Sequence, residues 1–145
     1  MAQEAPDPPR GARISIVSHK VTFYETDAMG VVHHSNYLRF FEEARTRWLE
    51  DHDQPYSEYI AQDLHFAVTE AKASYHRSAT FADLLEITVW MEWVRGASLR
   101  MAYRIERDGE LIVSGYTEHA SINSKGRLRR IPKPRRDHLT RATPQ

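Results

Sequence analysis

The sequence predicts an α+β fold in which a curved antiparallel sheet of five strands wraps around one long central helix. Residues 35–50 have the 3.6-residue period of an amphipathic helix. Several other segments alternate apolar and polar residues, as half-buried strands do. Short turns join the last of these segments, which makes neighbouring strands antiparallel. Because the helix must bury its apolar face, the sheet is expected to cover that face.

The first half of the chain is expected to form a strand, a turn and the helix. Residues 14–23 are rich in β-branched residues, which favour a strand. Asp27 and Gly30 are turn formers and precede a polar segment. Ser35 or Asn36 can begin the helix, because a short side-chain oxygen accepts an otherwise unpaired backbone N–H of the first turn.

The predicted helix has one strongly apolar face. Tyr37, Phe41, Ala44 and Trp48 recur at spacings of four, three and four residues. The opposite face carries charged residues, some paired one turn apart, and is expected to be solvated. Pro55 ends the helical pattern. Three further apolar residues widen the buried face: Leu38, Phe40 and Leu49.

The rest of the chain is expected to be strands. Their predicted ranges are residues 66–77, 85–93, 99–105 and 111–122. The first of these has mixed parity, whereas the next two have unbroken apolar rows on one face. Arg95-Gly96 and Asp108-Gly109 supply the turns that join the last three strands into a meander.

Composition divides the chain into three parts. Residues 1–13 are rich in proline and glycine and are expected to be a flexible leader. Residues 14–132 form the folded domain. Residues 133–145 are expected to be a basic tail, since residues 125–145 hold eight basic residues and one aspartate although the whole chain is neutral.

Composition also excludes several classes of function. The 145 residues include no cysteine, which rules out thiol nucleophiles and thiolate metal sites. No apolar run approaches the roughly 18 residues that span a membrane, and the start is too polar for a signal peptide, so a cytoplasmic location is expected. The apolar strand rows indicate that the uncovered face of the sheet, or an edge strand, pairs with another copy, giving at least a homodimer.

Spacing alone suggests one place for chemistry. Asp27 precedes the start of the helix, and helix N-termini carry unpaired N–H groups that stabilise an oxyanion. A carboxylate there can attack a bound carbonyl or activate water. The alternative from these features is that Asp27 only caps the backbone of its turn.

The run DAMGVVHHSNY, from Asp27 to Tyr37, carries a family resemblance. It resembles hotdog-fold acyl-CoA thioesterases of the 4-hydroxybenzoyl-CoA thioesterase type and the Tol-Pal-associated branch. The resemblance continues over about 120 residues, through residues 71–83, 115–119 and 126–132. It implies the hotdog fold and hydrolysis of an acyl-CoA thioester to the free acid and coenzyme A.

The resemblance also implies roles for individual residues. Asp27 matches the catalytic carboxylate, either nucleophile or general base. His34 matches both the backbone N–H that polarises the thioester carbonyl and a functional histidine side chain. The sequence has Phe23 where that branch has a tyrosine. The adjacent Tyr24 either has a role in the site or is a structural ring that packs near it. The expected substrate contacts are Tyr24, Gly30, Val31, Val32, Asn36 and Tyr37.

Arginines are the expected partners of the coenzyme A phosphates. The candidates are Arg95, Arg100, Arg127, Arg129 and Arg130. No cofactor is expected, because a thiolate leaving group with a conjugate-acid pKa of roughly 8 to 9 needs little assistance. No histidine and carboxylate spacing near the motif fits a metal site. The basic tail lacks interleaved aromatic residues, which disfavours nucleic-acid binding.

Two alternatives to acyl-CoA hydrolysis remain. The thioester carrier can be an acyl carrier protein, in which case a protein surface competes for the basic region. The chain can also be a non-catalytic acyl-CoA-binding protein. The acyl chain itself is not predicted by the sequence.

Overall fold

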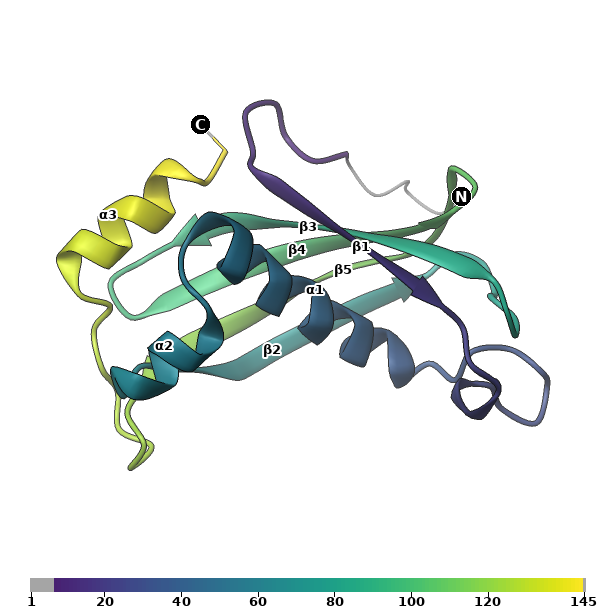
Figure 1. The fold of residues 1–145 in the computed structure, drawn as a ribbon, viewed down its shortest axis with the longest axis horizontal. Helices are drawn as coiled ribbons and strands as arrows, with labels where there is room; N and C mark the ends of the chain where they lie inside the picture. The colour runs from purple at the N-terminus through teal and green to yellow at the C-terminus, as the bar shows by residue number, and fades with distance from the viewer. Residues whose placement is uncertain (1–6, 145) are drawn as a thin grey trace.

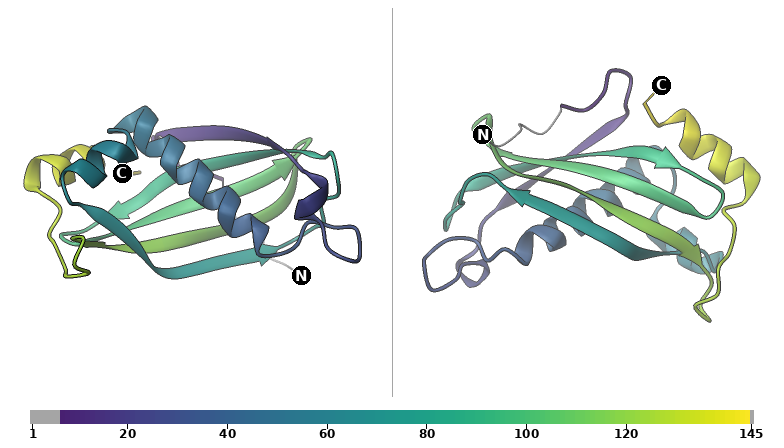
Figure 2. Two further views of the ribbon diagram at one scale, coloured as in Figure 1. Left: turned by 60° about the horizontal axis from the view of Figure 1, so that its bottom comes forward. Right: turned by 180° about the vertical axis from the view of Figure 1, so that it is seen from behind.

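A computed structural model describes residues 7–144. A five-stranded antiparallel sheet curls around one long helix, α1, which crosses its concave face (Figures 1 and 2). This confirms the predicted α+β hotdog architecture. The elements in chain order are β1 (Ile14–Lys20), η1 (Phe23–Glu25), α1 (Asn36–His52), α2 (Tyr56–Ala61), β2 (His65–Tyr75), β3 (Leu84–Val94), β4 (Ser98–Arg107), β5 (Glu110–Ile122) and α3 (Lys133–Arg141).

The strands lie in the order β1-β3-β4-β5-β2. The predicted meander is therefore the centre of the sheet, and β1 and β2 are its edges. Ile87 pairs with Ile105, and Ile105 pairs with Val113, so the apolar rows of β3, β4 and β5 lie side by side. All three side chains are fully buried. The row that faces α1 is the centre of the core.

The helix buries the face that its periodicity predicts. Tyr37, Phe41, Ala44 and Trp48 are each at most 3% exposed. Phe41 stacks on Tyr103 of β4 with ring centroids 4.2 Å apart. Leu38 is the exception among the predicted apolar residues at 41% exposed, because it lies about 100° around the helix from Tyr37.

The mixed parity of β2 has a structural cause. Its pairing with β5 shifts between Val68 and Glu70, which is a β-bulge. A bulge inserts one residue and exchanges the two faces, so no single parity fits the whole strand. The middle of β2 is exposed, with Val68 at 50%.

Two helices were not predicted. α2 lies in the connection between α1 and β2, and α3 lies in the segment expected to be a basic tail. Leu139 and Ala142 at the end of α3 are fully buried, and α3 contacts β3. The high charge of this segment hides one apolar face of a short helix, which is why its composition predicts a tail.

Part of the expected leader is also bound to the domain. Residues 1–6 lie outside the described residues. At the end of the leader, the Arg13 carbonyl accepts a hydrogen bond of 3.0 Å from the Trp48 indole N–H. The Arg13 backbone N–H donates to the carbonyl of Ala142 over 3.5 Å. The chain before β1 is therefore fixed between α1 and the end of α3.

Candidate active site

The segment between η1 and α1 holds the predicted catalytic residues, and Glu25 anchors it. The Glu25 side chain accepts hydrogen bonds from His19 Nε2 at 2.8 Å and from the Thr22 backbone N–H at 2.8 Å. Burial alone would raise the pKa of Glu25, but the hydrogen bonds from Thr22 and His19 outweigh it and lower the pKa. The Glu25 carbonyl accepts the Asn36 side-chain amide at 2.8 Å and the His33 backbone N–H at 2.8 Å. Glu25 thus joins both ends of the segment, a role that sequence reasoning missed.

Asp27 organises a tight turn within this segment. Its backbone N–H donates to the carbonyl of Val31 at 2.8 Å, and its own carbonyl accepts from Gly30 at 2.9 Å. Its Oδ1 accepts the backbone N–H of Met29 at 2.9 Å and more weakly that of Val31 at 3.4 Å. Gly30 has a φ of +79°, which glycine adopts readily. Among the described residues Oδ2 has no hydrogen-bond partner, so one oxygen fixes the turn and the other is available.

The start of α1 leaves a backbone donor available as well. Ser35 occupies the N-cap position but makes no side-chain cap, because its hydroxyl bonds His33 Nδ1 at 2.7 Å. No acceptor for the backbone N–H of His34 is present in the described part of the chain. The His34 ring is exposed and stacks on that of His33 with centroids 4.2 Å apart. The His34 carbonyl accepts the Tyr75 hydroxyl at 3.2 Å, which ties the helix start to the end of β2.

The other predicted substrate contacts are divided between surface and core. Tyr24 is 82% exposed, and Gly30 is exposed at the tip of the turn. Val32 and Tyr37 are only 5% and 3% exposed, so in a single chain they pack in the core beneath the turn. Val31 and Asn36 are half-buried between these layers.

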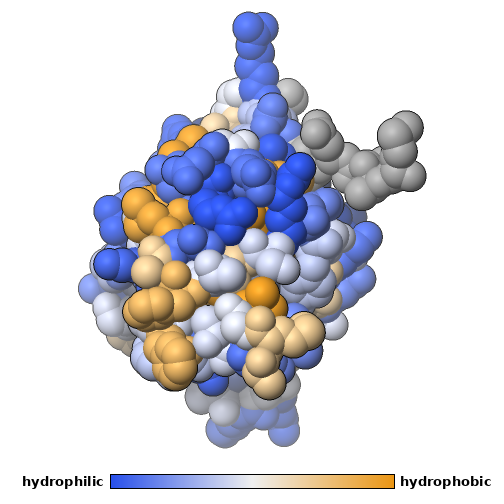
Figure 3. Space-filling view, turned by 90° about the vertical axis from the view of Figure 1, so that its right-hand side faces the viewer, coloured by the Kyte–Doolittle hydropathy of each residue, from blue (hydrophilic) through white to orange (hydrophobic). Residues whose placement is uncertain are grey.

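Apolar side chains border the Asp27 turn. Figure 3 views this end of the molecule and shows apolar residues gathered among polar ones. Phe23 is 77% exposed and contacts Phe81 edge-on at 6.1 Å. Met29 and Leu84 are also largely exposed. The turn therefore offers an apolar surface beside an available carboxylate oxygen.

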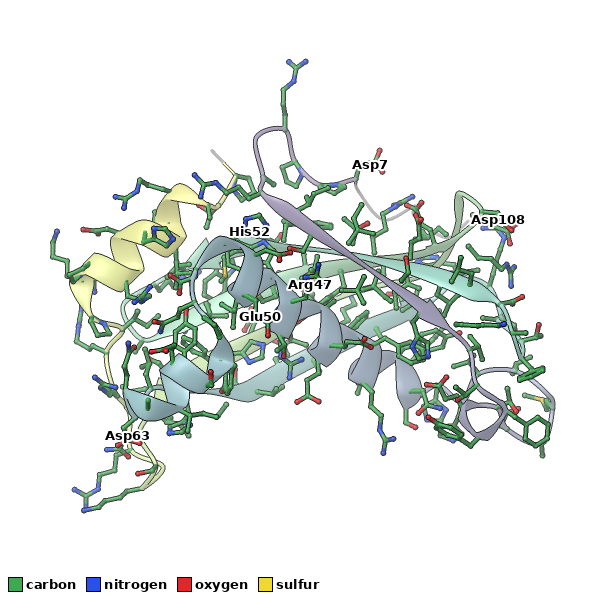
Figure 4. The ribbon with its side chains drawn as sticks, viewed as in Figure 1. Asp7, Arg47, Glu50, His52, Asp63 and Asp108 are labelled. Carbon is green, nitrogen blue, oxygen red and sulfur yellow. The ribbon has the colours of Figure 1, made fainter. Side chains whose placement is uncertain are left out.

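The predicted coenzyme A arginines lie at the opposite end of the sheet. Figure 4 labels Asp108 at the end of the sheet where the Asp27 turn lies, and Asp63 at the opposite end. Asp63 accepts the Ser124 backbone N–H at 2.8 Å, in the loop that leads to Arg127 and Arg129. The strand β2 has 11 residues and runs between the two ends, so its length is about 33 Å at roughly 3.3 Å per residue step. A single chain does not bring these arginines to Asp27.

Several of these arginines are also engaged within the chain. Arg100 binds Glu118 at 2.6 Å and lies 3.8 Å above the Tyr116 ring. Arg95 lies 4.0 Å above the Trp93 ring. Arg129 donates to the Gln62 carbonyl, and Arg130 packs on Gly96. Arg127 is exposed.

A cavity of about 170 Å³ lies under the second half of α1, away from the Asp27 turn. His119 of β5 lines it and is 2% exposed. Burial, with the nearby charge of Arg45, lowers the pKa of His119 to about 4, although the Phe66 backbone partly opposes this. His119 is therefore neutral at pH 7.

This histidine predicts a pH dependence of stability. The unfolded chain binds a proton at His119 near pH 6.5, whereas the folded chain binds it only near pH 4. Stability contributed by neutral His119 is therefore complete above about pH 6.5 and is lost as the pH falls towards 4, by about 3 kcal/mol in total. Urea unfolding at pH 7.5 and 4.5 should show a larger loss for the wild type than for His119→Phe. Equal losses would contradict this assignment.

Two classes of feature are not found in the described residues. No group of three or more histidine, aspartate or glutamate side chains in residues 7–144 is placed to hold a metal ion. Within the same range, no helix combines the length and the apolar composition needed to cross a membrane.

Comparison with known proteins decides the family. The family model of the thioesterase-like superfamily matches residues 21–142, from the end of β1 through α3. The chain belongs to the thioesterase-like superfamily. It is a thioester hydrolase with the hotdog fold, which confirms the family and the reaction class predicted from the sequence.

Individual members of the superfamily are similar over most of their length. A putative esterase of Aquifex aeolicus is 32% identical over 118 residues, which cover 81% of this chain and 91% of that protein. The acyl-CoA thioesterase YbgC of Haemophilus influenzae is 31% identical over 117 residues, covering 80% and 85%. The crystal structure of the hypothetical protein TT1821 of Thermus thermophilus has a TM-score of 0.86 and 32% identity, covering 92% of this chain and all of that one.

Proposed function

We propose that this superfamily member hydrolyses acyl-CoA thioesters at the Asp27 turn. The observation that carries the proposal is the pairing of two available groups at the start of α1. Asp27 has one carboxylate oxygen fixed by backbone N–H groups and one without a partner in the described residues. The uncapped helix start adds the backbone N–H of His34. A carboxylate and an oriented N–H are the groups that thioester hydrolysis needs.

The reaction can follow either of two routes. As general base, Asp27 removes a proton from water, the hydroxide attacks the carbonyl carbon, and the C–S bond breaks to release the coenzyme A thiolate. As nucleophile, the Asp27 oxygen attacks the carbonyl, the thiolate leaves, and water hydrolyses the resulting anhydride. In both routes the N–H of His34 donates to the oxyanion. The released thiolate needs little acid assistance, since its conjugate-acid pKa is about 8 to 9.

The named relatives support coenzyme A as the carrier, because the Haemophilus protein is an acyl-CoA thioesterase. An acyl carrier protein is the second candidate and would compete with coenzyme A thioesters through its acidic surface. A non-catalytic binding protein is the third candidate and would bind acyl-CoA without turnover. A cytoplasmic location is part of the proposal.

Release of free thiol tests the proposal. The wild type should release thiol from one or more members of a panel of short, long and aromatic acyl-CoAs, and Asp27→Asn should lower this rate at least about a hundredfold. Asparagine keeps the oxygen that accepts the turn N–H groups and removes the charge. Since the chain has no cysteine, every thiol detected is a product. Asp108→Asn, an exposed change in the β4–β5 turn, is the matched control and should keep full activity.

Three outcomes separate the alternatives. Full activity in Asp27→Asn would place the active site elsewhere. No thiol release from any acyl-CoA, with release from an acylated carrier protein, would favour the second candidate. Binding of acyl-CoA by both proteins without any turnover would favour the third.

The active site is proposed to be completed by a second copy of the chain, in a homodimer or a tetramer built from such dimers. β2 is an edge strand with an exposed middle, so its outer backbone groups are free to pair. Antiparallel pairing of two β2 strands about a twofold axis places the Tyr75 end of one copy beside the His65 end of the other. Asp27 of one copy would then face the side of the other that carries Arg127 and Arg129. Light scattering after size-exclusion chromatography should give at least twice the chain mass of 16.9 kDa, and a monomer contradicts the composite site.

A further inference from the structure

Glu25 is a second carboxylate close to the Asp27 turn, and neither route of hydrolysis uses it. Its side chain is buried, and the residue is only 7% exposed. The His19 ring nitrogen Nε2 lies 2.8 Å from its Oε1 and 3.0 Å from its Oε2. The Thr22 backbone N–H donates to Oε1 over 2.8 Å. Both carboxylate oxygens therefore have a partner, so Glu25 has no free oxygen with which to attack a carbonyl or take a proton.

The backbone of Glu25 forms the base of a short hairpin. Its carbonyl oxygen accepts the backbone N–H of His33 at 2.8 Å. The next pair, Thr26 and Val32, forms an antiparallel bridge. Asp27 follows directly and lies in the turn at the tip. The position of Asp27 is therefore set from the base of the hairpin, two residues before it.

The same carbonyl oxygen fixes the start of α1. It also accepts the Asn36 side-chain amide at 2.8 Å. His34 lies in the chain between His33 and Asn36, and both of these neighbours bind the Glu25 carbonyl. The backbone N–H of His34 is thus held from one side and the Asp27 carboxylate from the other. Glu25 joins the two groups that the proposed reaction requires.

The Glu25 side chain attaches this hairpin to the rigid part of the fold. His19 belongs to β1, and its ring lies against the buried Phe40 ring of α1 with centroids 4.4 Å apart. Its partner ring and its strand therefore fix His19 on two sides. A separate bond of 2.8 Å, from the Val32 N–H to the Ala79 carbonyl, holds the other strand of the hairpin. Without the Glu25 carboxylate the hairpin should remain attached on that side and gain freedom to pivot.

We propose that Glu25 is a positioning residue that, with His19, holds the Asp27 carboxylate and the His34 backbone N–H in the relative arrangement that thioester hydrolysis needs. The inference rests on the proposed function and adds a residue that acts through Asp27 and not on the substrate. A misplacement of about 1 Å between reacting groups lowers a rate by roughly a hundredfold. Loss of the Glu25 carboxylate should therefore slow the chemical step and leave the binding of acyl-CoA little changed.

The rate of thiol release from an acyl-CoA that the wild type hydrolyses tests the proposal. Glu25→Ala should lower kcat at least about tenfold and change KM less than about threefold. Glutamine keeps an oxygen for the Thr22 N–H and can donate its amide to the neutral His19 ring. Glu25→Gln should therefore keep kcat within about threefold of the wild type. A carboxylate that reacted with the substrate would instead lose its activity in both variants.

Asp51→Ala is the matched control. Asp51 is also a carboxylate that links α1 to β1, because it accepts the Ser15 hydroxyl at 2.7 Å. It lies 15 residues after Asn36 in α1, or about 22 Å at roughly 1.5 Å per residue, and therefore far from the Asp27 turn. This variant loses a similar attachment and should keep the wild-type kcat.

Hydrogen exchange measures the positioning without turnover. The backbone amides of Asp27 and His33 close the hairpin, and in Glu25→Ala they should exchange at least about tenfold faster than in the wild type. In Glu25→Gln and in Asp51→Ala they should exchange at the wild-type rate. An unchanged exchange rate in Glu25→Ala would show that the carboxylate does not hold the hairpin and overturns the inference.

The outcomes separate this inference from the proposed function. A wild-type kcat in Glu25→Ala overturns the inference even if Asp27→Asn is inactive, and so does an equal loss in Glu25→Ala and Glu25→Gln. If Asp27→Asn keeps full activity, the proposed function fails at that residue, and faster exchange in Glu25→Ala still supports the anchoring by Glu25. If Glu25→Ala does not fold, His19→Phe keeps the ring on Phe40 and removes the donor. A fall in kcat with little change in KM is then expected, and a wild-type kcat overturns the inference.

Discussion

Replacing Arg135 by alanine is expected to lower the free energy of unfolding by about 3 to 5 kcal/mol. Arg135 of α3 binds the Asp53 carboxylate, whose side chain is completely buried after α1. Tyr59 donates to the same carboxylate, and His138 lies 3.5 Å from it. Burial raises the pKa of Asp53, while the charges of Arg135 and His138 oppose this. Without Arg135 the buried carboxylate loses its closest positive charge, so α3 loses its attachment to α1.

Urea unfolding followed by tryptophan fluorescence measures this effect. Lys133→Ala is the matched control on the same helix, because it removes an exposed pair with Asp137 at 2.9 Å and should cost at most about 1 kcal/mol. Adding Asp53→Asn to Arg135→Ala should recover part of the loss, since a neutral amide needs no counter-charge. A loss in Arg135→Ala no larger than in the control would show that the buried pair does not hold α3.

Replacing Gly115 by alanine is expected to lower the free energy of unfolding by about 3 kcal/mol, at the upper end for overpacking. A Cβ atom at Gly115 would lie 2.0 Å from the carbonyl oxygen of Lys72 and 3.1 Å from the Phe41 ring. The first neighbour is backbone of the paired strand β2 and cannot rotate away. The strands β2 and β5 must therefore separate beside the helix.

The control for Gly115 isolates backbone conformation from contact. Gly126 has a φ of +75° and open space around it, so Gly126→Ala meets only the cost of a left-handed backbone, about 1 to 2 kcal/mol. Thermal unfolding of both variants gives the comparison. If Gly115→Ala is no less stable than Gly126→Ala, the close approach of the two strands is relieved at little cost.

The segment that we propose as catalytic was predictable because its signal is local. The turn at Asp27 and the helix start at Asn36 depend on neighbouring backbone groups, so residue type and spacing specify them. The same holds for the apolar rows of β3 and β4, which a period of two reveals. The local signal could not show Glu25 as the anchor, because its partners His19 and Asn36 come from both sides of the turn.

The sequence by itself determined the fold class, the family and the position of Asp27, since periodicity and a contiguous motif carry them. Only the tertiary structure decided that the basic segment is a docked helix, because Asp53 and Arg135 are 82 residues apart. It also decided that the predicted arginines and Asp27 lie at opposite ends of the sheet, and that His119 and Arg45 line the same cavity. These features depend on contacts between distant segments, and such contacts form only when the sheet closes around α1.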